Sequence, residues 1–209
     1  MSARPPAVAA GWVQRQLGYQ AADPALFERA LTHRSATRAN NERLEFLGDA
    51  VLNAIVSELL YLRYPTCDEG MLSRLRAAVV SGESLARVAA ALDLGQALQL
   101  GPGEMQSGGH RRESILADAF EALCGALYLE AGLARTREVL LQALAPALAA
   151  ARPEEVGKDA KTQLQEWLQG RGLPLPAYRV LKVEGEAHAQ NFEVSCEVGQ
   201  PPARAAGSG

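Results

Sequence analysis

The sequence predicts two parts, a mainly α-helical domain and a small α+β domain, joined by a linker. Up to residue 151, apolar residues recur at intervals of three and four, which is typical of amphipathic helices. Residues 152–160 are mostly polar and contain a proline and a glycine, which interrupt helices. Beyond them, residues 191–198 alternate between apolar and polar side chains, as in a half-buried strand. We therefore expect domains at residues 1–151 and 161–209, with 152–160 as the linker.

Seven stretches of the first part carry the helical spacing. The expected helices cover residues 6–17, 25–32, 40–63, 69–79, 82–92, 112–130 and 133–150. Residues 101–109 hold four glycines and a proline, so they predict a loop. In the second part we expect a short amphipathic helix at 162–169 and strands at 177–183 and 191–198.

Composition excludes several classes of protein. With 209 residues, 48% hydrophobic and 22% charged, the chain is globular and long enough for a sizeable core. No apolar run reaches the length of a signal peptide or a membrane span, so we expect a cytoplasmic protein. Its cysteines, Cys67, Cys124 and Cys196, are odd in number and widely spaced, which argues against a disulfide framework and a zinc site.

The net charge of −3 and the pI near 5.7 lack the basic character that nucleic-acid-binding proteins usually show. This balance counts against nucleic acid as a partner. It counts less if several acids hold metal ions, because bound cations can reverse the local charge.

Three carboxylates lie along one side of the helix expected at 40–63. At about 100° per residue, Glu42, Glu45 and Asp49 fall within an arc of roughly 60°, and the opposite side is apolar. Like charges at this spacing destabilise a helix by roughly 0.2–0.5 kcal/mol per pair. A divalent cation is the obvious partner to neutralise them.

The helix expected at 112–130 repeats this pattern. Asp118 and Glu121 stand three residues apart on one face, with the small Ala122 and Gly125 beside them. Small residues let a second helix approach closely, so the two helices would gather their acids into one cluster. The gathered acids would be Glu45, Asp49, Asp118 and Glu121. A cluster of carboxylate oxygens suits magnesium or manganese rather than zinc or copper.

Two other interpretations of these acids stay open. Acids three or four residues apart often form a solvated helix face, and a helical scaffold with such faces would need no metal. Di-iron bundles also use facing acids, but they add a Glu-x-x-His pair. His33, His110 and His188 stand in no such motif.

The segment from Asn41 to Asp49, NERLEFLGD, resembles the signature of the ribonuclease III family. Shorter segments agree with it: LTHRS at 31–35, DEG at 68–70, GPGE at 101–104, SGG at 107–109 and RESILAD at 112–118, with Glu121 and Ala122. The resemblance covers nearly the whole chain. It implies an all-helical endonuclease domain followed by a double-stranded RNA-binding domain of the α-β-β-β-α type.

The resemblance also implies an activity, the hydrolysis of both strands of double-stranded RNA with Mg²⁺, for which Mn²⁺ substitutes, and with no organic cofactor. By position, the metal ligands are Glu45, Asp49, Asp118 and Glu121, the catalytic acids are Asp49 and Glu121, and the supporting acids are Glu42 and Glu69. The implied products carry 5′-phosphate and 3′-hydroxyl ends with two-nucleotide 3′ overhangs, and the implied substrates include ribosomal RNA precursors. A catalytically silent RNA-binding protein on the same fold would normally lack one of the four ligands, and all four are present.

Phe46 lies close to the acidic arc rather than among the apolar residues of its helix. In the family this position packs across a homodimer, which would place two active sites on opposite strands of one duplex. A Phe46 buried beneath another helix of the same chain is the alternative. A twofold dimer is the commonest oligomer, and we expect a homodimer.

The segment from Asp159 onward resembles a double-stranded RNA-binding domain, which reads the shape and backbone of the duplex. The resemblance implies that Thr162, Gln163 and Glu166 meet one minor groove and that His188 enters the next. The alternative is that His188 is a surface histidine without a role in RNA binding.

This domain departs from the family pattern at its end. The family continues with a third strand and a helix that begins with basic residues, and none of that follows Gly209. From residue 156 on, the basic residues are Lys158, Lys161, Arg171, Arg179, Lys182 and Arg204, and the acidic ones are Asp159, Glu166, Glu184, Glu186, Glu193 and Glu197. Because the third strand and the basic helix are missing from the pattern, we expect an incomplete domain that folds poorly on its own. Because its charges balance, we expect it to bind RNA weakly.

Overall fold

The structure, a computed structural model, describes residues 7–154, 160–184, 191–199 and 202–208. The chain divides into two compact units, Met1–Val156 and Gly157–Gly209. Each unit is described by itself.

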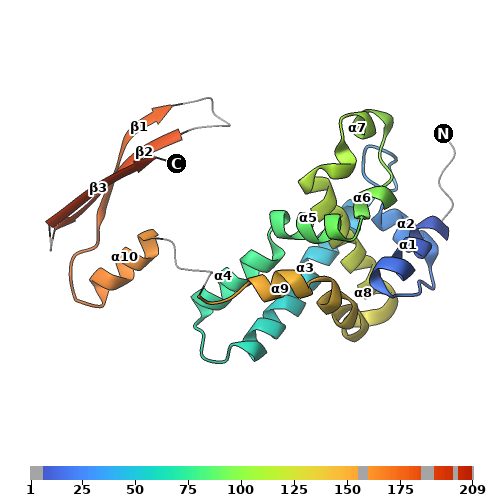
Figure 1. Cartoon of the computed structure of the whole chain (residues 1–209), viewed down its shortest axis with the longest axis horizontal. Coiled ribbons are helices and arrows are strands. Elements are labelled where there is room, and N and C mark those ends of the chain that lie inside the picture. The colour runs from blue at the N-terminus through green and yellow to red at the C-terminus, as the bar shows by residue number, and fades with distance from the viewer. Residues whose placement is uncertain (1–6, 155–159, 185–190, 200–201, 209) are drawn as a thin grey trace. The chain divides into compact units, whose positions relative to one another are not determined.

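The described part of the first unit is built from helices (Figure 1). They are α1 (Ala7–Leu17), α2 (Pro24–Ala30), α3 (Glu42–Arg63), α4 (Glu69–Val80), α5 (Gly82–Ala91), α6 (Leu94–Ala97), α7 (Pro102–Gln106), the 3₁₀ turn η1 (Gly109–Arg111), α8 (Glu113–Ala143) and α9 (Ala145–Ala150). The first five predicted helices are confirmed within two residues at each end. The short α6 was not predicted, because four residues are too few to show a period.

Two predicted boundaries in this unit are wrong. The loop expected at 101–109 contains α7, where Pro102 occupies the start of the helix and loses no hydrogen bond there. The break expected between the helices at 112–130 and 133–150 is confirmed, because Gly132 of α8 has a φ of 72° and a ψ of 174°, which are not helical and kink the chain there. Glycine adopts a positive φ without strain. The helix expected at 133–150 is divided, because α8 ends at Ala143 and α9 begins at Ala145.

Helices α3 and α8 cross in the middle of the first unit at two glycines (Figure 1). A β-carbon added to Gly48 would lie 1.7 Å from the backbone oxygen of Glu121. One added to Gly125 would lie 2.3 Å from the backbone oxygen of Leu44. No side chain fits between two backbones at these distances, so both positions require glycine. The close approach expected near Ala122 and Gly125 is therefore present.

The apolar sides of both helices enter the core of this unit. Leu52 and Ile55 of α3, and Phe120 and Leu123 of α8, are at most 1% exposed. Burying side chains of this size stabilises a fold by about 1.5–3 kcal/mol each. This packing holds the two helices together although each carries acids on its other side.

Glu130 of α8 is tied to the loop between α1 and α2. Its carboxylate accepts hydrogen bonds from the Tyr19 hydroxyl at 2.6 Å and from the backbone N–H groups of Ala22 and Asp23 at 3.0 and 2.6 Å. Burial raises the pKa of this carboxyl, but the three bonds outweigh it and the pKa falls below its usual value. Burial and the bond to Glu130 raise the pKa of Tyr19 to about 12.

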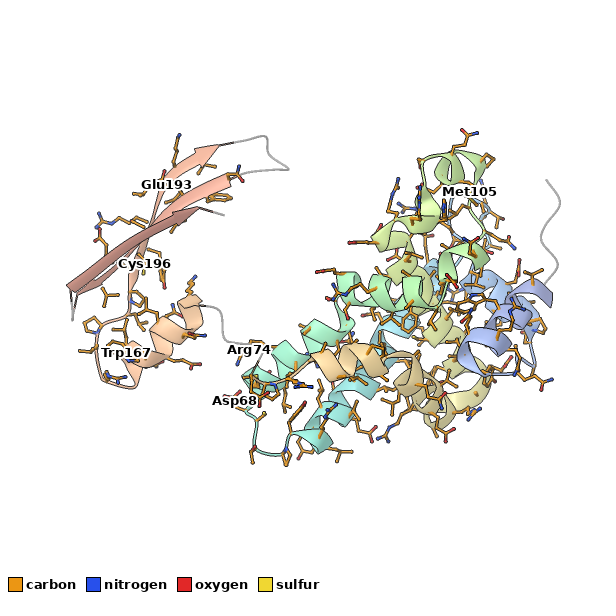
Figure 2. All side chains as sticks on the ribbon, viewed as in Figure 1. Asp68, Arg74, Met105, Trp167, Glu193 and Cys196 are labelled. Carbon is orange, nitrogen blue, oxygen red and sulfur yellow. The ribbon has the colours of Figure 1, made fainter. Side chains whose placement is uncertain are left out.

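A helix and an antiparallel sheet form the described part of the second unit. They are α10 (Ala160–Gln169), β1 (Ala177–Glu184), β2 (Asn191–Gly199) and β3 (Pro202–Ser208), with β2 in the centre of the sheet. The helix contributes the fully buried Leu168, and the guanidinium of Arg171 stacks 4.2 Å from the centroid of the Trp167 ring (Figure 2). The predicted helix and two strands are confirmed.

The expectation that the third strand is missing was wrong. Strand β3 pairs with β2 from Pro202 opposite Gly199 to Ser208 opposite Glu193. Its alanines, proline and glycine have little preference for strands, so the local pattern gave no signal. The strand forms because the edge of β2 offers a row of backbone donors and acceptors.

We predict that Gly48→Ala destabilises the protein by at least about 3 kcal/mol, since its β-carbon would collide with a backbone atom and not with a flexible side chain. Urea denaturation measures the change. Gly82→Ala is the matched control, because Gly82 is also helical and nothing lies within 4 Å of an added β-carbon. Equal stability of the two variants would contradict the close crossing.

Candidate functional site: an acid cluster at the helix crossing

The crossing of α3 and α8 positions the four acids that the sequence singles out. Glu45 and Asp49 lie on α3 on either side of Gly48, and Glu121 of α8 meets Gly48 through its backbone. Asp118 lies one turn earlier on α8. We call Glu45, Asp49, Asp118 and Glu121 the acid cluster. Asp49 is exposed and the other three are half-buried.

Burial and mutual repulsion perturb the acid cluster. At Glu121, burial and then the charges of Asp49, Glu45 and Asp118 raise the pKa to about 7. At Glu45, burial and then the charge of Asp118 raise the pKa above its ordinary value. Burial also raises the pKa of Asp118, where His33 and Arg34 oppose the shift. The neighbouring acids act on Glu45 and Glu121 because the backbone contact between the helices brings them within electrostatic reach.

The donor chemistry of the acid cluster fits a hard divalent cation. All four side chains offer carboxylate oxygens, the ligands that Mg²⁺ and Mn²⁺ prefer. As the side chains stand, no three His, Cys, Asp or Glu residues in the described ranges converge closely enough to hold one ion. Uncompensated carboxylates repel one another. The backbone therefore brings the four carboxylates near one another without closing them on one point.

The carboxylate of Asp49 is bonded to a side chain of its own helix. The Asn53 amide donates to Asp49 Oδ1 at 2.8 Å and to the Asp49 backbone oxygen at 3.0 Å. This double contact restricts the rotation of the carboxylate. It leaves the second oxygen, Oδ2, available to bind a ligand.

A polar pocket of about 490 Å³ adjoins the acid cluster. Glu45 and Asp118 form part of its wall. The rest of the wall comes from the segment before α3 and from the region between α7 and α8, and includes His33, Arg34, Asn41, Glu104, Arg112 and Ser114. Positive side chains thus stand beside the acids even though the whole chain is acidic.

The two supporting acids differ in their distance from the acid cluster, because Glu42 borders the same pocket as Glu45 and Asp118 and Glu69 does not. Glu42 is exposed, with Arg34 Nη1 3.6 Å from its Oε1 and the Asn40 amide donating to it at 3.0 Å. Glu69 is exposed at the start of α4 and accepts a hydrogen bond from the Ser73 hydroxyl at 2.8 Å. It does not contribute to the pKa shifts of the cluster.

Phe46 is 82% exposed, so burial beneath a helix of the same chain is excluded. On α10, Gln163 and Glu166 are exposed. The side chain of Thr162 and the whole of His188 lie outside the described residues. Cys67, Cys124 and Cys196 are free thiols.

Sequence reasoning missed His33, Arg34 and Asn41 as residues of this site. They border the polar pocket together with two members of the acid cluster. The signal was the LTHRS segment at 31–35, which lies ten residues before Glu45 and gives no indication of spatial proximity. Only the fold brings the segment to the acids.

We predict that Glu121→Gln makes the protein more stable in EDTA at pH 8, by roughly 1–2 kcal/mol after solvent screening. The folded-state pKa of about 7 lies above that of an unfolded glutamate, so the wild type loses stability as pH rises from about 4.5 through 7. The variant carries no charge at this position and does not lose that stability. Urea denaturation at pH 4.5 and 8 measures the free energy of unfolding of both proteins. A variant less stable than the wild type at pH 8 would contradict an unfavourable charge at Glu121.

Comparisons with known proteins agree with this geometry. Residues 23–148 match the family model described as ribonuclease-III-like, and residues 160–208 match that of the double-stranded RNA binding motif. Ribonuclease 3 of Aromatoleum aromaticum is 54% identical over 94% of this chain and 88% of its own length. Ribonuclease 3 of Pasteurella multocida is 53% identical over 89% of this chain and 83% of its own length.

A solved structure gives the same result for the first unit. The nuclease domain of ribonuclease III from Campylobacter jejuni superposes with a TM-score of 0.64 at 41% identity, covering 66% of this chain and 97% of that domain. No helix among the described residues has the length and apolar character to cross a membrane. The helical unit with its acid cluster and the α-β-β-β unit after it thus place this chain in the ribonuclease III family of double-strand-specific endoribonucleases.

Proposed function

We propose that the acid cluster binds Mg²⁺, for which Mn²⁺ substitutes, and that Asp49 and Glu121 are the acids on which RNA hydrolysis depends most. The proposal rests on four carboxylates gathered at one helix crossing, where burial and the neighbouring acids raise the pKa of Glu45 and Glu121. A divalent cation supplies the missing positive charge. The family's known dependence on a divalent metal supports the same assignment.

When bound, the metal would lower the pKa of a water molecule, orient it for attack on phosphorus and offset charge on the phosphate oxygens. The protein contributes ligands fixed by the backbone contact between Gly48 and Glu121. The Asn53 amide holds one oxygen of Asp49 in place, so that less freedom is lost when the carboxylate binds. We infer products with 5′-phosphate and 3′-hydroxyl ends, two-nucleotide 3′ overhangs, and cytoplasmic ribosomal RNA precursors as substrates.

Glu42 and Glu69 are proposed as supporting acids that lie in different parts of the first unit. Glu42 faces the polar pocket and bonds to Asn40, so it acts beside the acid cluster. Glu69 borders a largely apolar surface with Glu58, Tyr61 and Leu72, none of which belongs to the acid cluster. Any contribution of Glu69 is therefore to RNA or to a partner protomer.

The second unit is proposed to bind the RNA duplex. Its match to the double-stranded RNA binding motif supports this role, and Gln163 and Glu166 are exposed on α10 as such contacts require. Thr162 and His188 are proposed as further contacts. We retain residues 1–151 and 161–209 as the two functional parts, joined by 152–160.

The protein is proposed to act as a homodimer. Phe46, Ala50, Ala54 and Tyr61 of α3 are all exposed, and at about 100° per residue they fall within roughly 80° of one another. We call these four residues the Phe46 stripe. An exposed apolar stripe of this length favours a protein partner. Dimer formation is described for the nuclease domain from Campylobacter jejuni.

We predict that Glu121→Gln abolishes cleavage of labelled duplex RNA, with a loss of at least about a thousandfold, because a neutral amide replaces a metal ligand. The assay uses wild type and variant in Mg²⁺, and wild type in Ca²⁺ and in EDTA. Glu113→Gln is the matched control, because Glu113 is an exposed glutamate of the same helix outside the acid cluster.

Cleavage that survives Glu121→Gln, or that ignores the metal, would refute the acid cluster as the active site. Duplex binding by the wild type without any cleavage would identify a silent RNA-binding protein instead. A protein that shows neither metal dependence nor affinity for duplex RNA would be a helical scaffold with solvated acidic faces.

We predict that Phe46→Ala raises the dimer dissociation constant at least about a hundredfold. In a twofold dimer the Phe46 ring of each protomer would be buried, and each burial stabilises the dimer by about 1.5–3 kcal/mol. Analytical ultracentrifugation measures the change. Leu129→Ala, which removes an exposed side chain of α8, serves as the control. A dimer unaffected by Phe46→Ala would place the interface elsewhere.

A further inference from the structure

The polar pocket beside the acid cluster is only partly explained by metal binding. Glu45 and Asp118 belong to both, so a group in the pocket would lie next to the carboxylates. The remaining wall carries the carboxylates of Glu42 and Glu104, which lie beside Arg34 and Arg112 respectively. It also offers nitrogen donors, among them His33, Arg34 and Asn41. Donors of this kind suit an anion or another oxygen-rich ligand rather than a cation.

His33 is held in one orientation by Ser35. Its ring nitrogen Nδ1 accepts the backbone N–H of Ser35 at 3.2 Å and lies 2.8 Å from the Ser35 hydroxyl oxygen. That oxygen accepts the backbone N–H of Gly101 at 2.9 Å, which leaves the hydroxyl hydrogen for Nδ1. Because Nδ1 accepts these hydrogen bonds, the proton of the neutral ring is assigned to Nε2. The half-buried imidazole therefore brings one fixed donor to the pocket wall.

The loop that carries His33 is anchored to a second segment. The His33 backbone N–H donates to the Gln99 oxygen at 3.0 Å, and the Gln99 N–H donates to the Leu31 oxygen at 2.8 Å. A β-carbon added to Gly101 would lie 2.3 Å from the Ser35 oxygen, so the two segments touch through their backbones. The imidazole is thus placed by the fold and not by chance rotation of a surface loop.

Arg34 is a cation that is held only weakly. Its guanidinium stands 3.6 Å from Glu42, with both side chains more than half exposed, and exposed pairs at such distances are weak. Arg112 in the same pocket differs, because it lies 2.7 Å from the mostly buried carboxylate of Glu104. Arg34 can therefore exchange partners, whereas Arg112 is part of the wall.

Asn41 adds a buried donor to the same wall. It is 2% exposed, and its amide nitrogen has no hydrogen-bond partner among the residues that the structure describes. An unsatisfied buried donor is unfavourable unless an acceptor reaches it, directly or through water. Together with the histidine and arginine, it makes the pocket complementary to oxygen atoms.

We propose that this pocket holds a backbone phosphate of the RNA strand, next to the phosphate that is cleaved, through His33 Nε2 and the Arg34 guanidinium. The proposal rests on the nuclease function of the acid cluster. It gives an acidic protein a local anion site at the point where RNA must approach four carboxylates. Binding there would position the strand and leave hydrolysis to the acids.

The test measures kcat and KM for duplex RNA cleavage at saturating Mg²⁺ over a range of salt concentrations. For Arg34→Ala we expect kcat/KM to fall about tenfold, mainly through KM, and the slope of log(kcat/KM) against log[salt] to weaken by about one. Arg34→Lys should keep the slope. His33→Ala should lower kcat/KM by roughly 10- to 100-fold without changing the slope, because a neutral donor releases no counterion.

Arg38→Ala is the matched control, an exposed arginine close by that does not border the pocket. An unchanged KM and slope for Arg34→Ala would overturn the proposal, as would an equal loss in Arg38→Ala, since the effect would then be general attraction. Arg34 is exposed, so its variants test the site even if His33→Ala fails to fold. Failure of the wild type to cleave RNA would instead refute the nuclease function.

Discussion

The backbone contact between α3 and α8 is the constraint on which the rest of the structure depends. Gly48 and Gly125 let two helices meet with no side chain between them. This contact brings Glu45 and Asp49 of one helix to Asp118 and Glu121 of the other without any direct bond between the acids. Replacing either glycine would separate the helices and the ligands together, so fold and site share one determinant.

The same contact creates an electrostatic conflict. Burial of Glu121 and then repulsion from the neighbouring carboxylates disfavour its charged form, and its raised pKa expresses that cost. The apolar core formed by residues such as Leu52 and Phe120 opposes it. Glu130, bound by Tyr19 and two backbone N–H groups, also holds α8 in place outside the core. Under the proposed function, this loss of stability is exchanged for affinity toward a cation, as is common in active sites.

Net charge is a poor guide to function here because charge is arranged locally. The chain is acidic overall, yet His33, Arg34 and Arg112 border the pocket that adjoins the acid cluster. Part of the acidity is concentrated where a metal would neutralise it. An RNA substrate would therefore meet metal and arginine at the site rather than the average charge of the chain.

The sequence by itself determined the periodic elements and the family, and it singled out the four acids as candidates, because helical spacing and a nine-residue motif are local. Tertiary structure alone decided that Gly48 meets Glu121, that His33 lies beside Asp118, and that Phe46 is exposed. It also decided the third strand, whose alanines follow the edge of β2 and not their own preference. Each of these depends on contacts between residues far apart in the chain, and neither spacing nor propensity records such contacts.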